Sequence, residues 1–131
     1  MYNNDITIRK SSTSAPREIK ASADFQYVPV GITLDGSKFA AGELLLEGQC
    51  LVKDDTSGKY EKYTETTPGT FQAGKSDPVI LDESIKIPVD DDGDNVDVTA
   101  GQVMIKGTVW KGMIIGLTAA FQAKNPLIMY R

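Results

Sequence analysis

AGELLLEGQCLVKDDTSGKYEKY, residues 41–63, is the stretch of sequence that decides the fold. Two short apolar runs, Leu44–Leu46 and Cys50–Val52, precede the polar sequence DDTSGK and a Tyr-Glu-Lys-Tyr segment. Gly58 can adopt the positive φ that a tight turn requires, and Tyr60 suits a half-buried pleated surface. The stretch therefore predicts short strands joined by a turn, in a small β-rich body that packs and binds.

The rest of the chain predicts further short strands and a single short helix. In Gln102–Val109 the residues alternate, which predicts a strand with one face inward, formed by Val103, Ile105, Gly107 and Val109. The helix is expected at Thr118–Lys124, where Thr118 can cap the start and Asn125-Pro126 stops the helix. The predicted fold class is mainly β, a small barrel-like or tulip-like body with one short helix.

The chain of 131 residues suits one folded domain preceded by an arm. Residues 1–23 are small and polar, including the run SSTSA, and cannot bury a core, so they predict a flexible N-terminal arm. The β-rich domain is then expected at residues 24–131. Within the arm, Ile6-Thr7-Ile8 is β-prone and has two interpretations: an edge strand of the domain itself, or a strand that orders when it joins a partner's sheet.

Charge and hydropathy exclude several classes of partner. Residues 1–23 carry four basic and two acidic residues, whereas the remainder carries ten basic and sixteen acidic residues. An acidic body argues against nucleic-acid binding, which needs clustered Lys and Arg. No apolar run approaches the roughly 18 residues of a membrane span. Since Met1–Lys10 also lacks the apolar core of a signal peptide, we expect a soluble protein made in a cytoplasm.

Few residues could carry catalytic or metal chemistry. The sequence has no histidine, which removes the commonest general base and the commonest zinc ligand. Cys50 is the only cysteine and lies between apolar neighbours, so it is predicted to be a small buried hydrophobe. The segment Asp90–Asn95 does not follow the spacing of a calcium-binding loop and is predicted to form an acidic turn. We therefore expect no catalytic residues, no metal site, no cofactor and no enzymatic activity.

Trp110 follows the clearest predicted strand and has two interpretations. Tryptophan is enriched at the energetic centres of interfaces, which would make Trp110 an interface anchor. Alternatively, its large ring fills the core beside a turn. The sequence leaves both interpretations open.

Several short segments, in their order along the chain, resemble the lambda-type head decoration proteins of tailed bacteriophages. The segments that carry the resemblance are Ala41–Leu44 (AGEL), Lys59-Tyr60, Asp77–Asp82 (DPVILD), Val96–Val98, Gly107-Thr108-Val109 and an apolar C-terminal strand ending at Arg131. Thr108 stands where the family commonly has an acidic residue. The resemblance covers residues 31–131.

The resemblance implies a protein that binds as a trimer to the exterior of an expanded capsid and reinforces it against the pressure of packaged DNA. The implied partners are the major capsid protein and further copies of the same chain, and the implied location is the virion, after synthesis in a bacterial host. No nucleic acid, membrane or small-molecule substrate is expected. Because the arm in this family orders against capsid protein, the capsid-binding role falls on Ile6, Thr7 and Ile8.

Two alternative functions belong to other classes of binding protein. A trimeric tail or baseplate adhesin module would bind a host receptor in place of the capsid. A small-ligand-binding β-barrel would require a deep pocket lined by aromatic side chains such as Tyr27, Tyr60 and Trp110.

Overall fold

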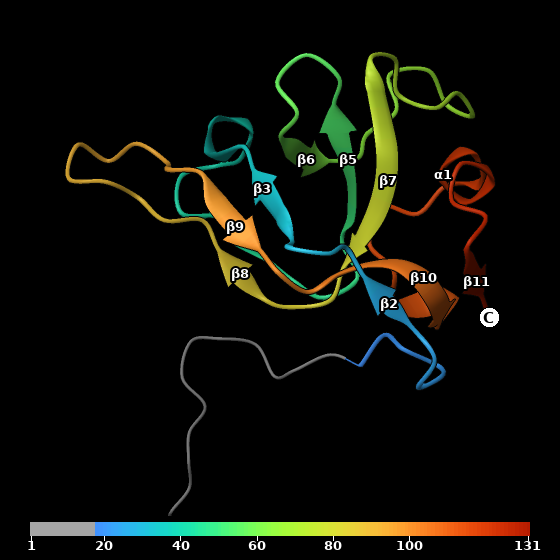
Figure 1. The fold of residues 1–131 in the computed structure, drawn as a ribbon. Helices are drawn as coiled ribbons and strands as arrows, with labels where there is room; N and C mark the ends of the chain where they lie inside the picture. The colour runs from blue at the N-terminus through green and yellow to red at the C-terminus, as the bar shows by residue number, and fades with distance from the viewer. Residues whose placement is uncertain (1–17) are drawn as a thin grey trace, which may run out of the picture.

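The structure is a computed structural model that describes residues 18–131. The described chain is mainly β, as predicted, and one short α-helix lies near its C-terminus (Figure 1). The helix is α1 (Ala119–Ala123), and two short 3-10 helices are η1 (Gly36–Lys38) and η2 (Lys111–Met113). The strands are β2 (Gln26–Tyr27), β3 (Ile32–Leu34), β4 (Leu44–Leu45), β5 (Cys50–Asp54), β6 (Tyr60–Lys62), β7 (Lys75–Leu81), β8 (Ile85–Lys86), β9 (Val98–Ala100), β10 (Val103–Val109) and β11 (Ile128–Tyr130).

Most of these strands form one sheet that curls into a half-barrel. The order across the sheet is β11-β10-β7-β5-β6-β3-β9, with β2 also paired to β10, and β4 and β8 form a separate pair. The β10–β11 and β3–β6 pairs are parallel, and the other pairs are antiparallel. Strand β11 therefore lies at one edge of the sheet and β9 at the other (Figure 1).

The stretch at residues 41–63 forms the strands and the turn that its sequence predicts. Strand β5 pairs with β6, with Leu51 opposite Lys62 and Lys53 opposite Tyr60. Gly58 in the connecting turn has φ +74°, and its N–H donates to the Asp54 carbonyl at 2.8 Å. The predicted need for a left-handed residue at this turn is confirmed.

Both faces of the central sheet bury apolar side chains, because successive residues of a strand point to opposite faces. One cluster contains Leu51, Val79, Leu81 and Val103 and lies under β3, β4 and β8. The other contains Cys50, Val52, Ile80, Met104, Val109, Ile128, Ile19 and Phe121. The prediction that Cys50 is a buried small hydrophobe is confirmed, since its exposed fraction is 0%.

The alternation predicted for β10 is only partly correct. Met104, expected on the outward face, is fully buried, and it shares a cluster with Val109 although the two are an odd number of residues apart. The pairing with β2 is irregular between Met104 and Lys106, and such a bulge moves later side chains to the other face. At Gly107, with φ +151°, a Cβ would lie 2.9 Å from the Phe25 Cβ, so only glycine fits.

The helix follows its sequence signals closely. The Thr118 hydroxyl accepts a hydrogen bond from the Phe121 N–H at 3.1 Å, which is the predicted N-terminal cap. The chain then turns at Asn125, whose side chain donates to the Pro78 carbonyl at 3.1 Å and so ties this end to β7. Phe121 is fully buried, and α1 therefore covers one face of the sheet.

The arm was predicted to include residues 1–23, but residues 18–23 belong to the folded body. Residues 18–25, which we call the strap, lie along β10, and Ile19 is fully buried. The Trp110 N–H donates to the Ile19 carbonyl, and the Ala21 N–H donates to the Thr108 carbonyl, both at 2.8 Å. Ile19 and Phe25 both pack on the same core cluster, and the backbone groups of the strap also complete a ladder with β10, so the segment is held in place. Ile6, Thr7 and Ile8 lie outside the described residues.

Within residues 18–131 no helix has the length and apolar character needed to cross a bilayer.

Candidate interaction surface

The β10–β11 pair exposes one face that no other part of the described chain covers. In the pair, Gly107 lies opposite Ile128, Thr108 opposite Met129, and Val109 opposite Tyr130. Because Val109 and Ile128 are buried, their neighbours along each strand point the other way. We call this side the outer face, and it consists of Lys106, Thr108, Trp110, Leu127, Met129 and Arg131.

The apolar side chains of the outer face are strongly exposed. The exposed fraction is 48% for Trp110, 63% for Leu127 and 59% for Met129. The structure thus removes the interpretation of Trp110 as a core residue, and its role as an interface anchor stays a prediction. An exposed apolar surface of this kind, on paired strands, is typical of a protein interface.

The outer face is also hollowed, which gives a partner something to fill. A depression of about 210 Å³ lies beside the strap. On one side it is bordered by Lys106, Leu127 and Met129 of the β10–β11 pair, and on the other by Ser22 and Asp24 of the strap. A second depression of about 350 Å³ begins on the far side of Leu127 and is mainly apolar, bordered by Val28 and Ile105. Leu127 therefore forms a ridge between two hollows.

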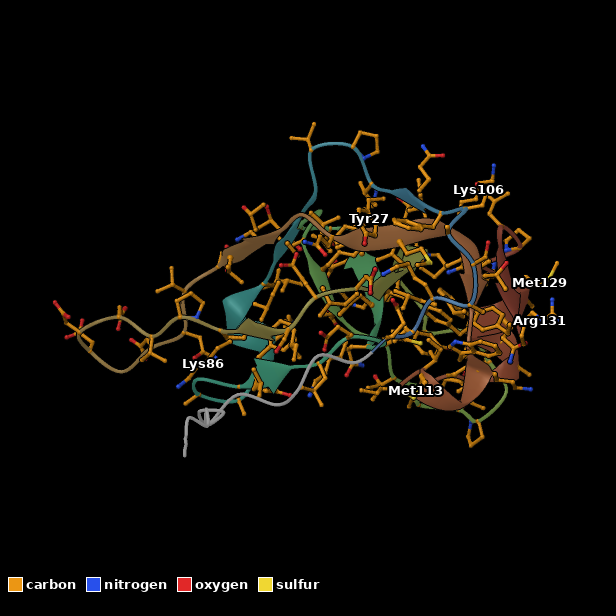
Figure 2. All side chains as sticks on the ribbon, turned by 90° about the horizontal axis from the view of Figure 1, so that it is seen from below. Tyr27, Lys86, Lys106, Met113, Met129 and Arg131 are labelled. Atoms are coloured by element: carbon orange, nitrogen blue, oxygen red, sulfur yellow. The ribbon has the colours of Figure 1, made fainter. Side chains whose placement is uncertain are left out.

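Unpaired positive charge surrounds this apolar surface. Lysines 20, 53, 59, 62 and 75 each form an ion pair within residues 18–131. Lys106, Lys111 and Arg131 form none there, nor do Lys38 and Lys86 elsewhere on the body, and Lys124 lies over the Phe71 ring at 5.6 Å. Figure 2 shows Lys106, Met129 and Arg131 together at one end of the molecule, with Lys86 toward the opposite end. The face thus combines apolar side chains with basic ones, and the exposed Asp24 of the strap borders its hollow.

The covered side of β10 is held by a buried carboxylate. The Asp82 side chain, 3% exposed, accepts from the Lys20 ammonium at 2.8 Å and from the Tyr27 hydroxyl at 2.6 Å. Partial burial, together with the hydrogen bond to Asp82, raises the pKa of Tyr27 to about 12. The Lys20 ammonium also lies 5.1 Å from the centre of the Phe25 ring. This cluster fixes the strap and β2 against the end of β7.

A second charged feature lies at the opposite end of the molecule, in the loop between β8 and β9 (Figure 1). We call residues 89–96 the hairpin tip, because Val89 and Asn95 form a bridge at its base. The Asp90 carboxylate accepts from the N–H groups of Asp92 and Asp94, both at 2.9 Å. The acidic turn predicted at Asp90–Asn95 is therefore present, and it is ordered by its own hydrogen bonds.

The metal-ligating side chains and the single thiol of residues 18–131 lie apart from one another or are buried. No group of three or more Asp, Glu, His or Cys side chains there is placed to hold a metal ion. Burial raises the pKa of the Cys50 thiol to about 12, which keeps it protonated and unreactive near neutral pH. Tyr60 borders two open depressions, and neither Tyr27 nor Trp110 borders them. The three aromatic residues named for a ligand pocket do not line these depressions together.

Comparison of the chain with protein families, with curated proteins and with solved structures gave no match.

Sequence reasoning singled out Trp110 but missed the rest of the outer face. The segment Leu127–Tyr130 belongs to the apolar C-terminal strand expected to end at Arg131, and the structure places β11 there. All four of its residues are apolar or aromatic, so the pattern does not tell which row is buried. Only the pairing with β10 shows that Ile128 points inward and Met129 outward.

Proposed function

We propose that this protein is a phage capsid decoration protein that binds the outer surface of the expanded head as a trimer and stabilises it against the pressure of packaged DNA. The observation that carries the proposal is the outer face, an exposed apolar and basic surface on a strand pair of a rigid body. Such a surface suits a protein that assembles with others. The resemblance of residues 31–131 to the lambda-type decoration family supplies the kind of assembly.

The division of the chain fits the demands of binding a repetitive lattice. A short segment such as Ile6-Thr7-Ile8 gains little affinity alone, because ordering it costs conformational entropy. Three copies held together offer three such segments to a shell that repeats the matching sites. The effective concentration of the second and third segments then raises the overall affinity by roughly a hundredfold or more.

The test adds the full chain, and a variant without residues 1–17, to purified expanded heads. We expect saturable decoration by the full chain, seen by electron microscopy and by co-sedimentation. The shortened variant retains Ile19 and the whole strap, so we expect it to fold normally and to lose attachment. Circular dichroism and thermal unfolding of the variant provide the control for folding.

Two outcomes would contradict the proposal or its details. If the folded full chain does not bind expanded heads at any concentration, the decoration function is rejected. If the shortened variant still decorates heads, attachment lies on residues 18–131 and the role given to Ile6, Thr7 and Ile8 is wrong.

A further inference from the structure

We infer that the outer face of one copy of this protein binds the hairpin tip of a second copy, so that the chain assembles head to tail. The inference rests on the proposed function, because it names the contact that would hold the copies of the decoration protein together. The two surfaces lie at opposite ends of the molecule, with the tip beyond β8 and β9 and the outer face at β10 and β11 (Figure 1). A tip therefore meets an outer face only when a second copy supplies it.

The first argument is charge complementarity. The outer face brings Lys106 and Arg131, and Lys111 adjoins it, since its N–H donates to the Arg131 carbonyl at 2.9 Å. None of the three forms an ion pair within residues 18–131. The hairpin tip brings the exposed carboxylates of Asp91 and Asp92, which likewise form no ion pair there. Opposite charges on two surfaces of one chain speed encounter and set the orientation of docking between copies.

The second argument is that both surfaces carry exposed apolar side chains beside the charges. Val89 and Val96 flank the acidic residues of the tip and are 45% and 43% exposed. On the outer face, Leu127 and Met129 border the depression of about 210 Å³. Two valines on either side of a narrow hairpin can cover such a ridge and hollow, and burying apolar surface adds the affinity that rim charges alone do not provide.

The third argument is that the tip is built as a rigid element. The Asn95 amide donates to the carbonyls of Phe39 and Ala40, both at 2.9 Å, and its oxygen accepts from the Gly42 N–H at 3.0 Å. The Val96 N–H donates to the Pro88 carbonyl at 2.8 Å. A protruding loop held by this many bonds loses little conformational entropy on binding, so preorganisation favours its use as a docking element.

The contact has a definite symmetry. Tip and face are different surfaces, so their pairing is heterologous, and a pair of copies keeps one free tip and one free face. A closed ring satisfies all of them when the rotation between copies allows it, and an open filament forms when it does not. The proposed trimer is the three-membered ring of this series.

The test uses charge reversal on the full chain, with association measured by sedimentation equilibrium. We expect the wild-type chain to associate with rising concentration. Asp91→Lys with Asp92→Lys changes only the tip, and Lys106→Glu with Lys111→Glu changes only the outer face. Each pair is expected to weaken association by about tenfold or more. The four changes combined restore both the net charge and the complementarity, so association should return.

The matched control is Lys38→Glu with Lys86→Glu. It alters net charge as much as the Lys106 and Lys111 changes do, and both residues are exposed. Both belong to the end of the molecule that carries the hairpin tip, since the Asn95 side chain donates to the Phe39 carbonyl next to Lys38 and the Lys86 side chain lies beside Gly42 and Val89. The control therefore adds negative charge beside the tip and none to the outer face. We expect this control to associate at least as well as the wild type. Circular dichroism of every variant checks that the fold is kept.

Three results would overturn the inference: a wild-type chain that stays monomeric up to about 1 mM, association that the tip and face changes leave unaltered, or a combined variant that fails to recover. Binding to expanded heads is measured separately with the same variants. Decoration without self-association rejects this contact and leaves the proposed function standing. Self-association of the expected pattern without decoration keeps the contact and rejects the proposed function.

Discussion

The two faces of the β10–β11 strand pair carry similar apolar side chains, but one face is buried and the other is exposed. On the inner face, Val109 and Ile128 are buried beneath Ile19 of the strap and Phe121 of α1. On the outer face, Leu127 and Met129 remain more than half exposed. The difference does not lie in hydrophobicity. It lies in whether another segment of residues 18–131 returns to cover that side of the strands.

Because of this difference, side chains that stabilise the fold and side chains that are free to bind a partner alternate along the same strand. Apolar side chains of the inner face contribute to folding, because their removal leaves a cavity among packed neighbours. Side chains of the outer face contribute little to folding and are available to a partner. Neighbouring residues on one strand can therefore be changed to test the two roles independently.

The largest expected effect comes from the adjacent pair Ile128 and Met129. Ile128 is 4% exposed, so Ile128→Ala should lower the free energy of unfolding by about 3 kcal/mol. Met129→Ala should change it by less than about 0.5 kcal/mol, because the side chain is 59% exposed. Urea denaturation followed by circular dichroism measures both. Equal losses in the two variants would contradict the separation of the faces.

A smaller loss is expected when the carboxylate that fixes the strap is removed. Asp82→Asn keeps the shape but weakens the bonds from Lys20 and Tyr27, which should lower the free energy of unfolding by about 2 kcal/mol. Asp24→Asn is the matched control, because Asp24 is an exposed carboxylate on the strap itself. This change should leave the free energy of unfolding nearly unaltered. A neutral Asp82→Asn variant would show that the strap does not depend on this cluster.

Alkaline pH should weaken the same cluster without any mutation. The pKa of Tyr27 is raised to about 12 in the folded chain, whereas an unfolded tyrosine ionises near pH 10, roughly its usual pKa. The unfolded state therefore loses its proton first, and stability should fall as pH rises from about 10 to about 12. In Tyr27→Phe this part of the decline should disappear. Thermal unfolding across this range is the measurement, and an unchanged slope in the variant would contradict the assignment.

The smallest effect on stability is expected at Val30, an exposed apolar residue whose backbone conformation is unfavourable. Val30 is 98% exposed and has φ +68°, a left-handed conformation that β-branched residues disfavour. Val30→Asn should raise the free energy of unfolding by about 0.5 kcal/mol, since asparagine tolerates this region. Val89→Asn, at another exposed valine without positive φ, should bring no such gain. The comparison distinguishes backbone strain from mere exposure of an apolar side chain.

Local signals in the sequence predicted the elements that local physics controls. The turn at Gly58 and the cap at Thr118 each depend on one residue and its near neighbours, and both are present in the structure. The acidic turn at Asp90–Asn95 is also where the composition placed it. Such features follow from backbone conformation and short-range hydrogen bonds, which the residue types at a few neighbouring positions determine.

The boundary of the arm and the composition of the outer face could not be predicted in this way. The position of Ile19 depends on a match with β10, about ninety residues later in the chain, and no local pattern encodes that match. The orientation of Met129 depends on the bulge between Met104 and Lys106, which moves the alternation of β10 by one residue. Both are properties of pairing between distant segments.

By itself, the sequence determined that this chain is a β-rich body without histidine chemistry, with short strands, tight turns and one brief helix. The tertiary structure alone decided which apolar row is covered and that the acidic tip and the basic face lie at opposite ends. It also decided which lysines form no ion pair within residues 18–131. The physical reason is that burial and ion pairing are relations between segments far apart in the chain. Composition and the alternation of apolar residues predict each strand, but only the packing of the folded chain determines which segment lies against it.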